Sequence, residues 1–231
     1  MQIPFHHKVY RKLVYTFHLW DSFPVAEHLT KEERNVLDLN IMKEIDGWLT
    51  TKEAIALFRI AKRLKRKCTI VEIGTWKGKS TFVLAKGLGS KGEIICIDPF
   101  DATAPFDKAS EKTYKSKTSK TSLFLQFKRK MVKLKVWNKI TPFKGYSSEY
   151  NSKRAIDFLF IDGDHSKKGC MFDFAKFSPL IKKGGFIGFH DYNENRKKFG
   201  VTQTVDLCVA DNNEYKYVGL YDSLWVAQKV S

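Results

Sequence analysis

The sequence lacks closely spaced cysteines, since none of its four forms a CxxC pair: Cys68, Cys96, Cys170 and Cys208. This absence excludes a zinc ribbon and a disulfide framework, is typical of a reducing compartment and predicts a cytoplasmic location. Long apolar runs are also missing, because no stretch approaches the ~18 uncharged apolar residues of a membrane-spanning helix. We therefore expect no membrane span. A hydrophobic content of 43% and an aromatic content of 14% exclude a disordered chain.

Acidic residues are scarce relative to basic ones: 25 Asp and Glu stand against 41 Lys and Arg, a net charge of +16 over 231 residues. Most of the excess lies in two stretches. Residues 59–67 carry six basic residues and no acid, and residues 101–140 carry eleven basic residues and three acids. Such stretches are typical either of a solvated lysine-rich surface or of a contact with nucleic acid or another polyanion. No nucleic-acid-binding motif accompanies them.

The spacing of apolar residues predicts two parts. Residues 1–50 are predicted to form an N-terminal helical cap, because Val9, Leu13, Val14 and Phe17 fall at helical spacing. Residues 51–231 are predicted to form the main domain. Its first helix follows a capping-box signature, Thr50 with Glu53. Five apolar residues at helical spacing make one face of that helix: Ala54, Leu57, Phe58, Ala61 and Leu64.

Apolar runs alternate with helical stretches through most of the main domain. We expect strands at 69–73, 94–97, 140–143, 156–161 and 186–189, with helices at about 79–87, 122–134 and 168–181. This alternation predicts an α/β fold with a parallel sheet covered on both faces. Runs at 215–220 and 224–228 predict a closing antiparallel pair. The Lys-, Ser- and Thr-rich residues 101–122 predict a loop.

A glycine loop, VEIGTWKGKS at 71–80, joins the first strand to a helix. A Walker A motif needs four residues between its first glycine and Gly-Lys, whereas Gly74 and Gly78 have three between them. A dinucleotide site needs GxGxxG, but position 76 is Trp. S-adenosylmethionine has no phosphate, so two glycines suffice. Glu72 would then lie near its ammonium group, and Asp98, which ends the second strand, would accept its ribose hydroxyls.

With these residues, the chain resembles class I S-adenosylmethionine-dependent methyltransferases, specifically the Methyltransf_24-type O-methyltransferases. That group includes cephalosporin-hydroxylase-like and macrocin O-methyltransferase-like enzymes. The matching stretches are GWLT at 47–50, VEIGTWKGKST at 71–81, IDPF at 97–100, IDGDHS at 161–166, KGG at 183–185 and FHDY at 189–192. The resemblance covers about residues 47–228. It implies a Rossmann-like sandwich whose seven-stranded, mostly parallel sheet has an antiparallel last strand.

Carried over by position, the resemblance also implies site residues. The implied cofactor-binding residues are Glu72, Gly74, Thr75, Gly78, Ser80, Asp98, Gly145, Tyr146, Ser147 and Asp162, with 145–147 near the adenine. The implied metal ligands are Asp162, His190 and Asp191, with His165 as the catalytic base. His190 stands where the metal-dependent relatives tend to place an acid. Because histidine ligates Mg²⁺ poorly, the alternatives are a softer ion such as Mn²⁺, Fe²⁺ or Zn²⁺, a water as third ligand, or no metal.

The sequence thus favours O-methylation of a hydroxyl on a small molecule, a sugar or a secondary metabolite, with or without help from Mg²⁺ or another divalent metal. Three alternatives stay open. One is a methyltransferase that acts on RNA or another polyanion through residues 59–67 and 101–140. The others are a non-enzymatic binding module and a degenerate P-loop nucleotide binder. The sequence is also compatible with a homo-oligomer.

Overall fold

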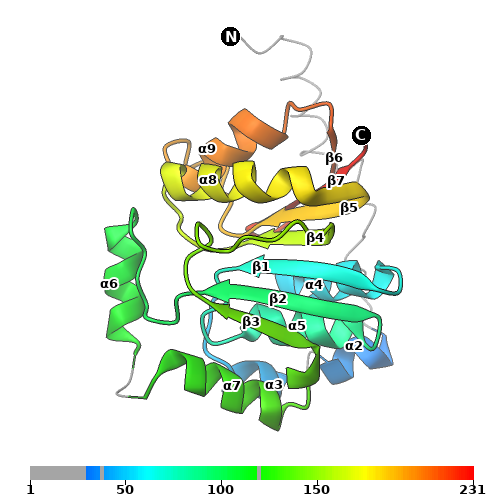
Figure 1. Ribbon diagram of the computed structural model, residues 1–231, viewed down its shortest axis with the longest axis vertical. Helices are drawn as coiled ribbons and strands as arrows, with labels where there is room; N and C mark the ends of the chain where they lie inside the picture. The colour runs from blue at the N-terminus through cyan, green and yellow to red at the C-terminus, as the bar shows by residue number, and fades with distance from the viewer. Residues whose placement is uncertain (1–29, 37–38, 119–120) are drawn as a thin grey trace.

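The computed structural model describes residues 30–36, 39–118 and 121–231 (Figure 1). Most of the predicted N-terminal cap, residues 1–29, lies outside the described residues. The described part of the cap contains two six-residue helices, α2 (Lys31–Val36) and α3 (Leu39–Glu44). Met42 and Ile45 are buried in the core of the main domain. This segment therefore packs on the main domain, while the division at residue 50 stays a prediction.

Within the described residues, seven strands form one sheet in the order β3-β2-β1-β4-β5-β7-β6. The strands are β1 (Cys68–Ile73), β2 (Gly92–Asp98), β3 (Ile140–Lys144), β4 (Ile156–Ile161), β5 (Ile181–Phe189), β6 (Tyr215–Tyr221) and β7 (Leu224–Lys229). Strands β1 to β5 pair in parallel, whereas β7 runs antiparallel to both β5 and β6. The predicted seven-stranded sheet with an antiparallel last strand is confirmed.

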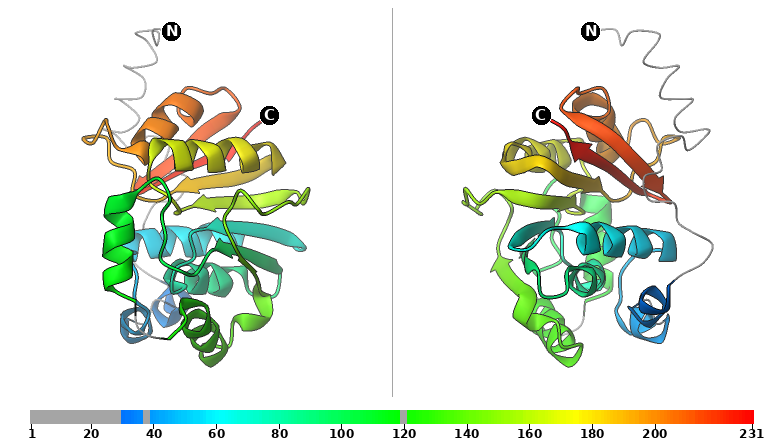
Figure 2. Two further views of the ribbon diagram at one scale, coloured as in Figure 1. Left: turned by 60° about the vertical axis from the view of Figure 1, so that its left-hand side comes forward. Right: turned by 90° about the vertical axis from the view of Figure 1, so that its right-hand side faces the viewer.

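Helices cover both faces of this sheet (Figures 1 and 2). One buried cluster joins the sheet to α4 (Thr51–Arg63), α5 (Lys79–Leu88) and α7 (Leu123–Lys133). A second cluster on the other face contains α8 (Lys167–Phe177), α9 (Gly200–Thr204) and the π-helical turn Val205–Val209. Side chains alternate between the two clusters, as Ile70 and Val71 of β1 do. Burial on both faces explains why the strands are continuous apolar runs.

The start of α4 follows from its capping box. The Glu53 backbone N–H donates to Thr50 Oγ1 (3.3 Å), and the Thr50 backbone N–H donates to Glu53 Oε2 (2.8 Å). Two backbone donors at the helix N-terminus are thereby satisfied. The five apolar residues predicted for one face of this helix are all buried. The prediction for α4 is confirmed.

Two local predictions are wrong. The predicted loop 101–122 contains a nine-residue helix, α6 (Lys108–Ser116), which buries no residue and has only two apolar residues, Ala109 and Tyr114, to signal a helix. Asp107 caps this helix by accepting a hydrogen bond from the Ser110 backbone N–H (3.1 Å). The helix predicted over 168–181 ends at Phe177, and Ile181 already belongs to β5. In Figure 1, α6 stands at the edge of the sheet toward which β2 points.

Candidate active site

A cavity of about 890 Å³ opens at the carboxyl ends of β1, β2, β4 and β5. Its volume falls within the range of roughly 300–1,000 Å³ that is usual for small-molecule sites. The predicted site residues that line it are Gly74, Thr75, Ser80, Asp98, Gly145, Tyr146, Ser147, Asp162, His165, His190 and Asp191. Glu72 and Gly78 lie behind this wall, where Glu72 is fully buried and Gly78 packs against Phe127.

The glycine loop lies directly on the end of β4. Gly74 has φ +86°, and a Cβ added there would lie 2.0 Å from the Asp162 carbonyl oxygen. Gly78 has φ +87°, and its Cβ would lie 2.7 Å from the Phe127 ring. Trp76 between them has φ +51°, a left-handed conformation that a bulky residue rarely adopts. Strain of this kind collects at functional sites.

Glu72 holds this loop from beneath. Its carboxylate accepts hydrogen bonds from Ser80 Oγ (2.6 Å), Thr81 Oγ1 (2.5 Å) and Thr75 Oγ1 (3.3 Å). Burial raises the pKa of Glu72 to about 7, although these hydroxyl donors favour the ionised form. The carboxyl thus fixes the strand-to-helix turn, and a contact between Glu72 and the cofactor's ammonium group stays a prediction.

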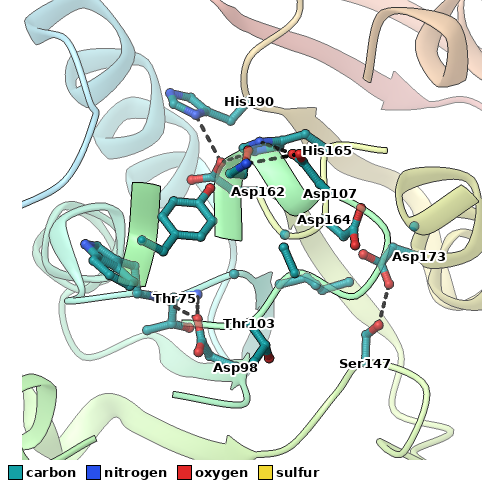
Figure 3. A pocket seen from close by; sticks show the side chains of 18 of the residues that line it. Thr75, Asp98, Thr103, Asp107, Ser147, Asp162, Asp164, His165, Asp173 and His190 are labelled. Carbon is teal, nitrogen blue, oxygen red and sulfur yellow. Dashed lines mark hydrogen bonds and ion pairs between the residues drawn. The ribbon is translucent and has the colours of Figure 1, made fainter. Parts of the chain in front are cut away.

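Asp98 joins the glycine loop to the turn after β2 (Figure 3). Its Oδ2 accepts from the backbone N–H groups of Thr75 (2.9 Å) and Trp76 (2.8 Å), and its Oδ1 accepts from that of Phe100 (2.6 Å). Burial raises the pKa of Asp98 to about 6 against these three donors, which lower it. The carboxylate lines the cavity at the expected place. Its contact with a ribose stays a prediction.

The loop after β3 forms another side of the cavity. Tyr146 Oη lies 2.9 Å from Thr103 Oγ1, which links this loop to the segment before α6. Ser147 Oγ donates to Asp173 Oδ1 (2.5 Å), a residue of α8 that the sequence did not single out (Figure 3). Burial raises the pKa of Asp173 to about 7. The adenine role of 145–147 stays a prediction.

Two carboxylates and an imidazole converge where β4 and β5 end. His165 Nε2 lies 3.6 Å from Asp162 Oδ1 and 3.4 Å from Asp191 Oδ2, yet this buried nitrogen has no hydrogen-bond partner. The opposite ring nitrogen lies 3.8 Å from Asp107 Oδ2. Burial lowers the pKa of His165, but these carboxylates outweigh it and raise the pKa above its ordinary value. One ligand atom from each of Asp162, His165 and Asp191 lies within 4.8 Å of the others, so this group could hold a metal ion.

Asp191 reaches this group through an unusual backbone conformation, φ +61°. His190, the residue before it, also contacts this group, with its Nδ1 3.5 Å from Asp191 Oδ2. Its Nδ1 lies 3.0 Å from Asp162 Oδ1, and its Nε2 lies 3.3 Å from Glu53 Oε2 of α4. With 3% of the residue exposed, His190 is enclosed among three carboxylates, those of Glu53, Asp162 and Asp191. Both histidines thus contact the two acids, and the roles predicted for them, His190 as a metal ligand and His165 as the base, stay predictions.

Four residues of the site escaped the sequence analysis. Asp107 had a usable signal, because an acid three residues before Ser110 is typical of a helix start. Glu53 was identified only as a helix cap. Tyr114 of α6 packs against Trp76 and Trp48, with ring centroids 5.2 and 5.7 Å away, and all three rings line the cavity. The fourth is Asp173 of α8, which accepts from Ser147 Oγ, and nothing in the sequence pattern pointed to it.

Comparison with known proteins agrees with this geometry. Residues 71–192, more than half of the chain, match the family model described as "Methyltransferase domain". The chain belongs to this methyltransferase family. An uncharacterized protein of Acanthamoeba polyphaga mimivirus is 30% identical over 153 residues, which cover 66% of this chain and 64% of the viral protein. The chain thus matches less than two thirds of that relative's length.

Solved structures share the fold of the methyltransferase domain. The O-methyltransferase TomG from Streptomyces achromogenes, involved in tomaymycin synthesis and solved with S-adenosylmethionine, has a TM-score of 0.56 at 14% identity; 90% of this chain and 93% of TomG are covered. An O-methyltransferase from Bacillus cereus with S-adenosylhomocysteine has a TM-score of 0.53 at 16% identity, covering 97% of each chain. The fold is that of class I S-adenosylmethionine-dependent methyltransferases, and binding of the cofactor by the glycine loop stays a prediction.

The sequence analysis expected no membrane-spanning helix. Among residues 30–36, 39–118 and 121–231 of the methyltransferase chain, no helix is long and apolar enough to cross a bilayer.

Proposed function

We propose that the protein transfers a methyl group from S-adenosylmethionine to a hydroxyl of a small-molecule acceptor. The observation that carries this proposal is His165 Nε2, a buried nitrogen without a hydrogen-bond partner that faces Asp162 and Asp191 at the cavity wall. This nitrogen is charge-paired with both carboxylates but hydrogen-bonded to neither, so its hydrogen-bonding capacity is left for a ligand or a proton.

The cofactor would lie across the carboxyl ends of β1, β2 and β3. Asp98 would accept the ribose hydroxyls, and Gly145 to Ser147 would line the adenine. The methionine part would then run over Gly74 and Thr75 toward Asp162. This placement would direct the methyl group at the acid and histidine group, because the glycine loop lies directly on the end of β4. Holding the acceptor oxygen and the methyl group in line is the protein's main contribution.

An aromatic wall supports a small acceptor with an apolar face. Trp48, which is 47% exposed, and Trp76 have ring centroids 6.4 Å apart, and Tyr114 lies against both. Flat rings of this kind pack against the ring of a sugar or of an aromatic metabolite. TomG, which shares the fold, is involved in the synthesis of tomaymycin. We extend a secondary metabolite or sugar acceptor to this chain as part of the proposal.

The donor set also fits a divalent metal. Asp162, His165 and Asp191 would hold it, and their mixture of oxygen and nitrogen ligands favours Mn²⁺, Fe²⁺ or Zn²⁺ over Mg²⁺. A bound cation would lower the pKa of the acceptor hydroxyl. Without a cation, the same His165 nitrogen is placed to accept the hydroxyl proton as a general base, while Asp107 Oδ2 lies 3.8 Å from its other nitrogen. One nitrogen cannot perform both roles, so the two versions exclude each other.

Calorimetric titration with S-adenosylhomocysteine tests the cofactor site first. Substituting Asp98 is a poor test, because its loss would also free three backbone N–H groups of the loop. The sharper comparison uses an analogue that lacks the ribose hydroxyls, for which we expect at least tenfold weaker binding. Absence of S-adenosylhomocysteine binding would refute the proposal.

A screen of hydroxylated sugars and metabolites with methyl-labelled cofactor would then identify the acceptor. Transfer that survives EDTA but is lost in His165→Ala assigns this histidine as the base. Transfer that is lost in EDTA and restored by Mn²⁺ assigns it as a ligand. If His165→Ala keeps full activity under both conditions, neither role holds.

A further inference from the structure

We infer that Glu53 is a positioning residue of this site, which acts by holding His190 against Asp162. The capping box at the start of α4 would then serve the active site as well as the helix. The role in methyl transfer rests on the proposed function, whereas the structural part of the inference can be tested without it.

Glu53 is held by more groups than a helix cap requires. Glu53 is only 1% exposed. A capping box accounts for just one of its hydrogen bonds, from the Thr50 backbone N–H to Oε2. The same oxygen lies 3.3 Å from His190 Nε2. Oε1 accepts from both the backbone N–H (3.0 Å) and the hydroxyl (2.6 Å) of Ser223, in the turn between β6 and β7. Glu53 therefore joins three segments that are far apart in the sequence.

His190 connects Glu53 to Asp162 at the cavity wall. Its ring is enclosed, with one edge toward the Phe160 ring at a centroid distance of 6.3 Å, so it has no room to turn. Its Nδ1 lies 3.0 Å from Asp162 Oδ1, while the Asp162 side chain remains 22% exposed and lines the cavity. Figure 3 shows His190 above Asp162, on the side away from Asp98. Asp162 is therefore fixed from behind, with one face left for the contents of the cavity.

Such outer partners matter because they orient the groups that react. Removing the partner of a metal-ligating side chain typically weakens metal affinity about 10–100-fold. Glu53 is one residue further out, so we expect the lower end of that range. Methyl transfer needs its groups held within about 0.5 Å, so a shift of Asp162 would also slow the reaction.

The central variant is Glu53→Asp, which keeps an acid in the first turn of α4 but withdraws it from His190 by one methylene. Glu53→Gln is a partial rescue variant: its amide oxygen can still face Thr50 and His190, whereas its NH2 group replaces Oε1, which accepts from the Ser223 backbone N–H. Thr50→Ala is the matched control. It removes the other half of the capping box and the hydroxyl's bond to Asp222 (2.7 Å) but leaves the Glu53–His190 contact in place.

The first readout is the proton NMR signal of the His190 Nε2–H group, which faces Glu53, assigned by its loss in His190→Asn. A ring N–H held by a buried carboxylate exchanges slowly and resonates at low field. We expect this signal in the unsubstituted protein, Glu53→Gln and Thr50→Ala, and its loss in Glu53→Asp. The second readout is Mn²⁺ titration, for which we expect about tenfold weaker binding in Glu53→Asp alone, with S-adenosylhomocysteine affinity unchanged.

Persistence of the ring signal and of the Mn²⁺ affinity in Glu53→Asp would overturn the inference. Equal losses in Thr50→Ala would also overturn it, because they would reflect general weakening of the helix start. If the unsubstituted protein binds neither Mn²⁺ nor S-adenosylhomocysteine, the proposed function fails. The ring signal would still decide whether Glu53 holds His190.

Discussion

Replacing Glu72 by glutamine should remove a pH dependence from the stability of the fold. Glu72 lies beneath the glycine loop without solvent exposure, and burial raises its pKa to about 7 from an ordinary value of 4.5. The folded protein therefore holds this proton more tightly than the unfolded chain does. The protonated carboxyl stabilises the fold fully below about pH 4.5, and the contribution is lost as the pH rises through about 7.

The magnitude follows from the two pKa values. Their difference corresponds to about 3 kcal/mol in all, of which about 2.5 kcal/mol falls between pH 5 and pH 8. Glutamine has nearly the same shape and does not ionise in this range. It can still bond the hydroxyls of Ser80 and Thr81, because a hydroxyl donates and accepts. Glu72→Gln should therefore gain about 2.5 kcal/mol relative to the unsubstituted protein on going from pH 5 to pH 8.

Guanidinium unfolding at pH 5, 6, 7 and 8 would measure this difference. Other buried carboxyls titrate in the same range, but they are common to both proteins and cancel in the comparison. Glu214→Gln, at an exposed position before β6, is the control for removal of a carboxylate from the surface. If the free energies of unfolding of Glu72→Gln and the unsubstituted protein run parallel from pH 5 to pH 8, burial does not control the titration of Glu72 and the reasoning is refuted.

Two further predictions concern the loop and the cavity wall. Gly74→Ala should destabilise the fold by about 3 kcal/mol or more and abolish S-adenosylhomocysteine binding, because its Cβ would clash with the Asp162 carbonyl oxygen. Gly184 also has a positive φ, +82°, but open space around it, so Gly184→Ala measures the backbone strain alone. Equal losses of unfolding free energy in the two variants would contradict the clash. Trp48→Ala should raise the acceptor KM about tenfold with little change in melting temperature, whereas Leu125→Ala on α7 should change neither. An unchanged KM in Trp48→Ala would exclude this ring from the acceptor site.

Much of the fold followed from the sequence because buried strands are continuous apolar runs. The prediction for residues 156–161 coincides with β4, and that for 94–97 covers the apolar centre of β2. Where exposed residues enter an element, the pattern weakens. Strand β5 begins five residues before the predicted 186–189, because Lys182, Lys183 and Gly184 are exposed. Helix α6 escaped prediction for the same reason, since it buries none of its residues.

The site was predictable as far as topology determines it. Parallel strands end at one edge, so Asp98, Asp162 and Asp191 had to meet there. The partners of individual side chains depend on elements that the pattern does not place. His190 and Glu53 are 137 residues apart, and their contact arises because the start of α4 packs beside the β6–β7 turn. A capping box gives no hint that its glutamate has a second partner.

The structure separates the two basic stretches that motivated a polyanion acceptor. Residues 59–67 end α4 and precede β1, whereas the cavity follows the other end of that strand. Six strand residues span about 20 Å, and the screening length at physiological ionic strength is about 8 Å, so these charges act weakly on the site. In the described part of residues 101–140, α6 lies at the cavity edge, where Lys108 (2.8 Å) and Lys115 both pair with Glu111, and Lys117 Nζ lies 4.1 Å from the centroid of the Trp48 ring. Beside the three cationic residues Lys79, Lys168 and Arg196, the cavity wall carries seven aspartates: Asp46, Asp98, Asp107, Asp162, Asp164, Asp173 and Asp191. A polyanion would bring its phosphates against these carboxyls, whereas a neutral hydroxylated ring meets no such repulsion, so the charge distribution favours the small acceptor.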